Sequence, residues 1–153
     1  RWDAVPADPA STPIRVIVVD DDPMLRSSVV ELLEDLGFSV VAAAEDGERG
    51  VSLAAEHRPD VVLMDLRMPG IDGIEATRRI RGADDTVQVV IYSAYSDAGF
   101  QAGAEEAGAS RYLVKGCGPD LLADVLRAAG SVRRQLDTGA AADVDPPTQE
   151  GSR

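Results

Sequence analysis

Five polar side chains in this sequence follow apolar runs of strand length. Asp20 and Asp21 come directly after one run, and Asp65 comes after another. Ser93 and Lys115 follow two later runs. Parallel strands place their carboxyl ends along one edge of a sheet, where ligands bind in open α/β folds. The sequence therefore predicts a polar site that brings together three carboxylates, a hydroxyl and an ammonium group.

The three predicted carboxylates need a cation among them. Clustered carboxylates repel one another, and each raises the pKa of its neighbours unless a positive charge lies between them. Mg²⁺ fits because it binds a few carboxylates and keeps several water ligands. The ammonium and the hydroxyl then remain to bind the oxygens of a phosphoryl group carried by Asp65. This pattern predicts magnesium-dependent phosphoryl chemistry at Asp65.

Lysine usage singles out one of these residues. Of the 15 basic residues, Lys115 is the only lysine, and all the others are arginine. A solitary lysine among arginines can mark a place where a compact ammonium is needed and a planar guanidinium does not fit. Chance retention on a surface loop is the alternative, and the residue count leaves both interpretations open.

Alternating strands and helices are predicted to position the site. Apolar runs predict five strands, over residues 14–19, 38–43, 60–64, 86–92 and 110–114. Helical periodicity and capping residues predict five helices, over residues 23–36, 46–58, 72–81 and 97–107 and from 118 onward. Asp22, Asp60 and Asp72 are expected to cap helices or begin strands, with no role in the site. Five strand–helix repeats predict an α/β fold with one doubly wound parallel sheet, covered on both faces.

Composition limits the class of protein. A chain of 153 residues holds one domain, predicted over residues 13–136, with disordered tails over 1–12 and 137–153. A net charge of −12 argues against a nucleic-acid partner, because phosphate contacts need clustered basic residues. No apolar run is long enough for a membrane span or a signal peptide, and Cys117 is the only cysteine. We expect a cytoplasmic protein that contacts neither a membrane nor nucleic acid.

Four segments resemble the receiver domain of bacterial two-component response regulators. They are VVDDDP at 18–23, VVLMDLRMPGIDG at 61–73, VVIYSAY at 89–95 and GASRYLVKG at 108–116. The resemblance covers about residues 13–135 and is closest to receivers that usually carry a C-terminal LuxR-type helix-turn-helix. It implies a flavodoxin-like sheet with strand order 2-1-3-4-5. No apolar periodicity continues after Gln135, so no helix-turn-helix is expected within these residues.

The resemblance implies which residues carry the phosphoryl group and the metal ion. Asp65 would be the phosphoacceptor. The Mg²⁺ ligands would be the carboxylates of Asp20, Asp21 and Asp65 and the backbone carbonyl of Arg67. The phosphoryl group would come from a sensor histidine kinase, and homodimer formation on phosphorylation is compatible with this type of domain.

The resemblance also implies how the signal leaves the site. Ser93 and Lys115 would bind the phosphoryl group, and Tyr112 would be an aromatic switch that turns inward when Ser93 moves. The surface of the fourth and fifth strands would change as a result. Arg67 and Tyr95 would tune dephosphorylation, because both are large enough to screen the phosphoryl group from water.

Two other functions are weighed against this interpretation. Asp20 and Asp22 fit the Asp-x-Asp pattern of a haloacid-dehalogenase-type phosphatase, but no acidic pair follows Tyr92 to complete that metal site. A receiver used only for docking, without phosphorylation, would not need the complete set of acid, hydroxyl and lysine. We expect no enzyme activity beyond the protein's own phosphorylation and dephosphorylation.

Two features depart from the family pattern. Gly116 follows Lys115 where many receivers have a cis proline, which leaves the direction of the lysine side chain less defined. Gly99 and Gly103 lie within the predicted helix 97–107, and each costs about 1 kcal/mol relative to alanine in a helix interior. This helix is therefore expected to be loose.

Overall fold

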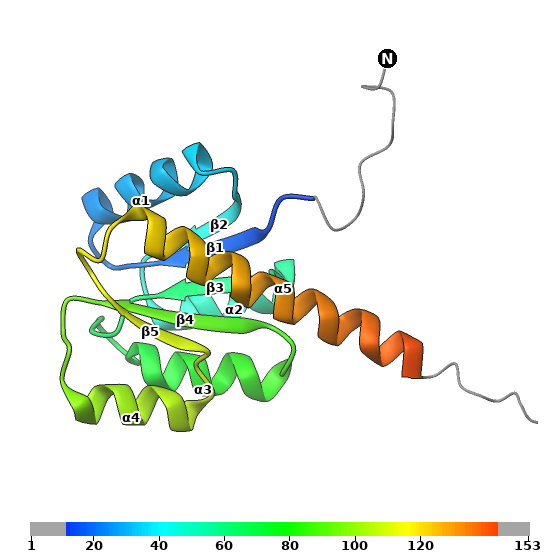
Figure 1. Ribbon diagram of the computed structural model, residues 1–153. Coiled ribbons are helices and arrows are strands. Elements are labelled where there is room, and N and C mark those ends of the chain that lie inside the picture. The colour runs from blue at the N-terminus through cyan, green and yellow to red at the C-terminus, as the bar shows by residue number, and fades with distance from the viewer. Residues whose placement is uncertain (1–11, 144–153) are drawn as a thin grey trace, which may run out of the picture.

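Five parallel strands form the sheet at the centre of the molecule (Figure 1). The computed structural model describes residues 12–143, and the strand order is β2-β1-β3-β4-β5. The strands are β1 (Arg15–Val19), β2 (Ser39–Ala44), β3 (Val61–Met64), β4 (Gln88–Ser93) and β5 (Arg111–Val114). The helices are α1 (Pro23–Asp35), α2 (Gly47–His57), α3 (Gly73–Ala83), α4 (Ala98–Ala107) and α5 (Pro119–Asp143). The predicted doubly wound α/β fold and its strand order are confirmed.

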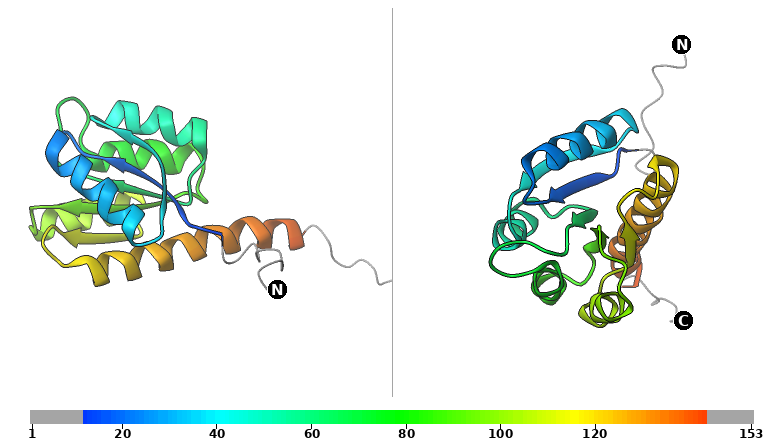
Figure 2. Two further views of the ribbon diagram at one scale, coloured as in Figure 1. Left: turned by 90° about the horizontal axis from the view of Figure 1, so that it is seen from above. Right: turned by 90° about the vertical axis from the view of Figure 1, so that its left-hand side faces the viewer.

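The helices cover both faces of the sheet. α1 and α5 pack on one face, and α2, α3 and α4 pack on the other (Figure 2). Val16 and Val18 of β1 contact the α1 and α5 side, whereas Ile17 and Val19 contact the opposite side. A strand buried on both faces has an unbroken apolar sequence, and this is why the strands were visible as continuous runs.

Aspartate residues fix where the first four helices begin. Asp22, Asp46, Asp72 and Asp97 are the N-caps of α1, α2, α3 and α4. Each carboxylate accepts a hydrogen bond of 2.7–2.9 Å from a backbone N–H two or three residues ahead. Such a cap contributes about 1 kcal/mol, because it satisfies a donor that the helix leaves unpaired. The predicted capping roles of Asp22 and Asp72 are confirmed.

The last helix is longer than the sequence predicted. α5 runs to Asp143, past residue 136, where we expected a disordered tail to begin. The segment 137–143 lacks large apolar residues, but alanine has the highest helix propensity. Asp137 also pairs with Arg133 one turn earlier, at 3.1 Å. The predicted tails over 1–11 and 144–153 lie outside the described residues.

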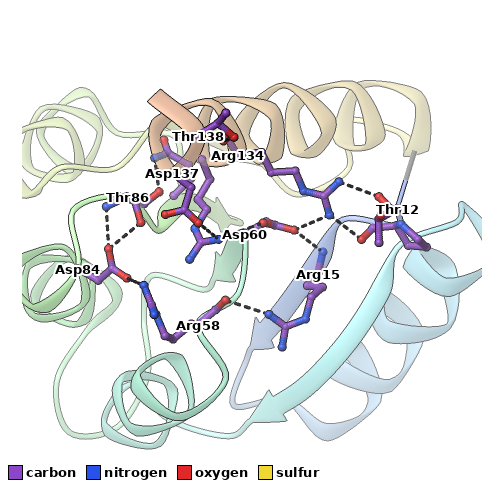
Figure 3. A network of polar contacts seen from close by, with 12 residues as sticks. Thr12, Arg15, Arg58, Asp60, Asp84, Thr86, Arg134, Asp137 and Thr138 are labelled. Atoms are coloured by element: carbon purple, nitrogen blue, oxygen red, sulfur yellow. Dashed lines mark hydrogen bonds and ion pairs between the residues drawn. The ribbon is translucent and has the colours of Figure 1, made fainter. Parts of the chain in front are cut away.

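A buried carboxylate at the amino end of β3 joins α5 to β1 (Figure 3). Asp60 is 4% exposed, and its Oδ2 accepts hydrogen bonds from the Arg15 N–H at 2.9 Å and from Arg134 Nη2 at 3.0 Å. Arg134 also donates to the backbone carbonyls of Thr12 and Pro13, both at 2.8 Å. We call this set of contacts the Asp60 clasp. It lies at the opposite end of the strands from the predicted site, so Asp60 has no part in that site.

Candidate functional site

The structure brings the predicted polar side chains to the carboxyl edge of the sheet. Asp20 and Asp65 directly follow β1 and β3, which pair with each other. Ser93 is the last residue of β4, and Lys115 directly follows β5. A backbone hydrogen bond of 2.7 Å from the Lys115 N–H to the Ser93 carbonyl ties these last two strand ends together. These four strands therefore deliver their polar residues to the same edge of the sheet, as predicted.

An acidic group and a lysine form the centre of the site. Carboxylate oxygens of Asp20, Asp21 and Asp65 all lie within 4.8 Å of one another. Lys115 Nζ lies 2.9 Å from Asp20 Oδ2 and 3.4 Å from Asp65 Oδ1. The side chains of Asp20 and Asp65 are only 5% and 10% exposed, whereas Asp21 is exposed. The surface-loop interpretation of Lys115 is therefore wrong, because its ammonium reaches into the acidic group.

Burial and the neighbouring charges shift the pKa values of Asp65 and Lys115. Burial raises the pKa of Asp65, the neighbouring charge of Asp20 raises it further, and Lys115 opposes the rise only in part. Burial by itself would lower the pKa of Lys115, but its hydrogen bond to Asp20 and the charge of Asp65 outweigh that effect and raise it. An additional cation beside Asp65 would favour its ionised form.

The donor set is suited to Mg²⁺. Three carboxylates at the edge of a sheet supply hard oxygen ligands, and the exposed Asp21 leaves room for water ligands on the solvent side. The raised pKa of Asp65 gives the electrostatic reason for a cation. The residues present therefore fit the metal ion that the sequence predicted.

Ser93 is held in place by its own loop. It is fully buried, and its Oγ accepts a hydrogen bond of 3.0 Å from the Tyr95 N–H. The Tyr95 carbonyl in turn accepts a hydrogen bond from the Tyr112 hydroxyl. Tyr112 is half-buried and packs against the apolar core on the α2, α3 and α4 side. Two hydrogen bonds therefore connect Ser93, at the end of β4, with the Tyr112 side chain on β5, through the backbone of Tyr95.

The sequence did not predict the surroundings of Arg67. Its guanidinium carbon lies 5.3 Å from the centre of the Tyr95 ring and 6.0 Å from the centre of the Phe100 ring. The two rings meet edge to face, with centres 6.1 Å apart and an interplanar angle of 78°. We call Arg67, Tyr95 and Phe100 the aromatic stack. No spacing rule indicates it, because the residues come from the β3–α3 loop, the β4–α4 loop and α4.

Gly73 was also missed as a residue of the site. A Cβ atom at this position would lie 2.1 Å from the backbone carbonyl oxygen of Asp65. The Gly73 N–H donates a 2.7 Å hydrogen bond to the carbonyl of Leu66. The start of α3 therefore packs directly on the backbone that carries Asp65, and only glycine permits this approach.

An open parallel sheet with this set of acid, lysine and hydroxyl side chains at its carboxyl edge is the architecture of a signalling receiver. The family model of the response regulator receiver domain matches residues 16–127. The chain belongs to the response regulator receiver family. Proteins of this family act in signalling, typically bind Mg²⁺ and interact with histidine kinases, and some of them dimerise.

Individual relatives agree with this assignment. The response regulator GacA from Pseudomonas aeruginosa is 37% identical over 124 residues, which cover 80% of this chain and 58% of GacA. A two-component response regulator of the LuxR family from Aurantimonas sp. SI85-9A1 has a TM-score of 0.74 and 38% identity, covering 78% of this chain and 86% of that chain. The signal receiver domain of NarL from Mycobacterium tuberculosis has a TM-score of 0.72 and 34% identity, covering 76% and 96%.

The similarity to GacA extends over only part of that protein. The chain spans less than two thirds of the length of GacA. The predicted similarity to receivers of LuxR-type regulators is confirmed, and none of the comparisons supports the haloacid-dehalogenase alternative. Within residues 12–143, no helix combines the length and the apolar character that crossing a bilayer requires.

Proposed function

We propose that Asp65 accepts a phosphoryl group from a sensor histidine kinase in a Mg²⁺-dependent reaction. The observation that carries this proposal is the position of the Asp65 carboxylate. It lies beside two further carboxylates and 3.4 Å from the only lysine of the chain. This arrangement supplies a nucleophile, a metal site and a cation for the transferred group.

The metal ligands are assigned to the acidic side of the site. The carboxylates of Asp20, Asp21 and Asp65 and the backbone carbonyl of Arg67 would hold Mg²⁺. The bound ion would neutralise negative charge that develops on the phosphoryl oxygens. Asp20 would also keep Lys115 directed into the site through their 2.9 Å hydrogen bond.

The transfer step uses one carboxylate oxygen of Asp65 as the nucleophile. The new O–P bond forms as the P–N bond of a phosphohistidine breaks, and the electron pair of that bond returns to the imidazole nitrogen. Lys115 would bind one phosphoryl oxygen, and the Ser93 hydroxyl would donate its proton in a hydrogen bond to another. Ser93 can do so while its Oγ still accepts from the Tyr95 N–H.

The same residues suggest how the signal leaves the site. A shift of Ser93 toward the phosphoryl group would move Tyr95 and, through the Tyr95 carbonyl, the hydroxyl of Tyr112. Tyr112 would then turn inward and change the surface formed by β4 and β5. Arg67 and Tyr95 would slow hydrolysis of the phosphoryl group by limiting the access of water. Homodimer formation on phosphorylation would use the changed surface, and the protein would work in the cytoplasm without turning over an external substrate.

Mass spectrometry with a small phosphodonor tests the proposal. Acetyl phosphate and Mg²⁺ should add one phosphoryl group to the wild-type protein, and removal of Mg²⁺ with EDTA should abolish the addition. Asp65→Asn should remain unmodified, whereas Asp46→Asn should be modified like the wild type, because asparagine also caps helices. Equal labelling of the wild type and Asp65→Asn would refute the assignment. Absence of labelling in the wild type would favour the docking receiver that works without phosphorylation.

A further inference from the structure

A cavity of about 360 Å³ lies between the carboxyl ends of α2 and α3, at the amino edge of the sheet. Its apolar walls consist mainly of small side chains: Val51, Ala54 and Ala55 of α2, Ile80 and Ala83 of α3, and Val87 directly before β4. Ala54, Ile80 and Val87 are buried and form its floor, whereas Ala55 and Ala83 are exposed at its mouth. Small-molecule sites in proteins are typically apolar cavities of about 300–1,000 Å³ that carry a few polar groups. The cavity therefore has the size and the lining of a site for a small ligand.

Two opposite charges complete the lining of the cavity. Arg58 and Asp84, the C-caps of α2 and α3, point toward each other across its mouth (Figure 3). Arg58 Nη2 lies 3.5 Å from Asp84 Oδ2, which is longer than the distance of about 2.7–2.9 Å in a charge-assisted hydrogen bond. The Arg58 side chain is 66% exposed, and such an exposed pair contributes little to stability. A ligand can therefore replace this contact with shorter ones at low cost.

Contacts outside the cavity hold both charged residues in place. Asp84 Oδ1 accepts hydrogen bonds from the Thr86 N–H at 3.0 Å and from the Thr86 hydroxyl at 2.7 Å, which leaves Oδ2 free to face Arg58. Burial opposes the ionised form of Asp84, but these hydrogen bonds and the charge of Arg58 outweigh burial and lower its pKa. Arg58 has a left-handed backbone with a φ of 47°, and its carbonyl accepts a 2.9 Å hydrogen bond from Arg15 Nη1. Such a backbone conformation in a residue other than glycine is found at ligand sites, where the surrounding structure maintains it.

We propose that this cavity binds a free α-amino acid with an apolar side chain. The inference goes beyond the proposed function, because the cavity lies at the opposite edge of the sheet from Asp65. The apolar side chain of the ligand fills the cavity and loses its contact with water. Its α-carboxylate accepts hydrogen bonds from the Arg58 guanidinium, and its α-ammonium donates to Asp84 Oδ2.

The two charges at the mouth select this class of ligand. An apolar carboxylate would pair with Arg58, but its negative charge would also lie beside the ionised Asp84. An apolar amine would pair with Asp84, but it would lie beside the positive charge of Arg58. An α-amino acid carries both charges on one carbon atom, so each of them can face its opposite. Repulsion therefore disfavours the ligands with a single charge.

NMR titration with L-leucine and L-phenylalanine tests the proposal. The backbone amide signals of the cavity lining in α2 and α3 should shift on addition of these amino acids. Isocaproate lacks the ammonium of leucine and isopentylamine lacks its carboxylate, so each should bind about tenfold more weakly than leucine. Glycine has both charges but no apolar side chain, and it should bind more weakly for that reason.

Variants of the lining separate the contributions of the charges and of the cavity. Arg58→Gln and Asp84→Asn should each lower the affinity for leucine about tenfold, because each removes one charge and keeps a polar side chain of similar shape. Ala55→Leu should block the mouth and leave the core intact, since Ala55 is exposed on a helix. The control is Arg79→Gln, which removes a charge from an exposed ion pair with Glu75 on α3, outside the cavity lining. This variant should bind leucine like the wild type.

The outcomes decide the proposal without reference to phosphorylation, because Asp65→Asn should bind both amino acids like the wild type. Shifts in α2 and α3 that weaken in Arg58→Gln, Asp84→Asn and Ala55→Leu, but not in Arg79→Gln, would support it. The absence of shifts at about 10 mM of either amino acid would overturn it. Equal affinities for leucine and isocaproate, or for leucine and glycine, would also overturn it, because the ligand would then need only one charge or no apolar side chain.

Discussion

Gly73 shows how a single residue limits the geometry around Asp65. Its backbone N–H holds the Leu66 carbonyl, and its missing side chain leaves space for the Asp65 carbonyl. A methyl group at this position would overlap with backbone atoms, which cannot move aside as a flexible side chain can. The resemblance marked the segment 61–73 as a whole, but it did not show that Gly73 supports the phosphoacceptor.

Gly73→Ala should destabilise the fold by about 2–3 kcal/mol, because the methyl group must displace the backbone of Asp65. It should also slow phosphorylation by acetyl phosphate. Gly82→Ala is the control, since nothing lies within 4 Å of a Cβ atom at that position. It should be neutral or stabilise by up to about 0.5–1 kcal/mol. Urea unfolding of both variants checks this, and equal stability of the two would contradict the proposed role of Gly73.

The raised pKa of Asp65 should affect how the stability of the Mg²⁺-free protein depends on pH. Burial raises its folded-state pKa above the ordinary value of 3.8, so the folded protein binds a proton more tightly than the unfolded chain. The contribution of Asp65 to stability therefore falls as the pH rises from 3.8 through its raised pKa. Asp65→Asn should remove this loss and have a higher thermal midpoint than the wild type at neutral pH.

Thermal unfolding of the wild type and Asp65→Asn between pH 4 and pH 8 measures this effect. The difference between the two proteins should grow with pH and then level off. A constant difference over the whole range would mean that Asp65 ionises normally in the folded state.

Among the elements, α5 depends most on contacts that the sequence could not show. The turn of α5 before its extension is joined to the sheet by the Asp60 clasp, which is made of residues far apart in sequence. Asp60 is also 3.7 Å from Arg133, at its other carboxylate oxygen. Apolar periodicity identifies the part of a helix that packs on a core, but it does not detect a helical end that is held by ion pairs.

Arg134→Ala should destabilise the protein by about 2 kcal/mol. The change leaves the more distant guanidinium of Arg133 as the ion-pair partner of the buried Asp60 carboxylate. Breaking a buried ion pair costs about 3–5 kcal/mol. The cost is lower here because Arg134 is partly exposed. Amide hydrogen exchange should become faster in residues 131–143 and around β1. Arg79→Ala breaks only an exposed pair with Glu75 and should cost less than about 1 kcal/mol. Unchanged exchange in Arg134→Ala would show that α5 is held by its apolar contacts alone.

The strands and the first four helices could be predicted because the residue patterns that mark them lie within each element or directly before it. An aspartate before each of α1 to α4 marks the helix start, and continuous apolar runs mark the strands. Asp20, Asp65 and Lys115 could be placed together because strand ends in a parallel sheet share one edge. Phe100 could not be added, since it belongs to α4, and α3 and β4 separate it from Arg67 along the chain. Side-chain contacts between separate loops follow from packing and not from spacing along the chain.

For the whole molecule, Mg²⁺ should act as a stabilising ligand. An ion that binds the folded state but not the unfolded chain raises stability by about 1.4 kcal/mol at a concentration of ten times its Kd. For a domain of this size, that corresponds to a rise of a few degrees in the thermal midpoint. Asp20→Asn should lose most of this rise, because it removes a carboxylate from the group of three.

Calorimetry with MgCl₂, compared with NaCl of equal ionic strength, separates binding from charge screening. The protein carries a net charge of −12, so added salt alone should change its stability through screening. Equal midpoints in the two salts would contradict a specific metal site. A full Mg²⁺ response in Asp20→Asn would remove that residue from the set of ligands.

The Asp60 clasp has a topological consequence. One guanidinium, that of Arg134, touches the carbonyls of Thr12 and Pro13, so the path of the chain into β1 and its path along α5 meet at a single point (Figure 3). The segment between them, with the sheet and the whole candidate site, is therefore a nearly closed loop. Such a loop can be inserted into a host protein at one surface position, because its two ends need not be pulled apart. The Asp60 clasp therefore gives the domain the geometry that insertion into another protein requires, because it holds the two ends of the folded segment together.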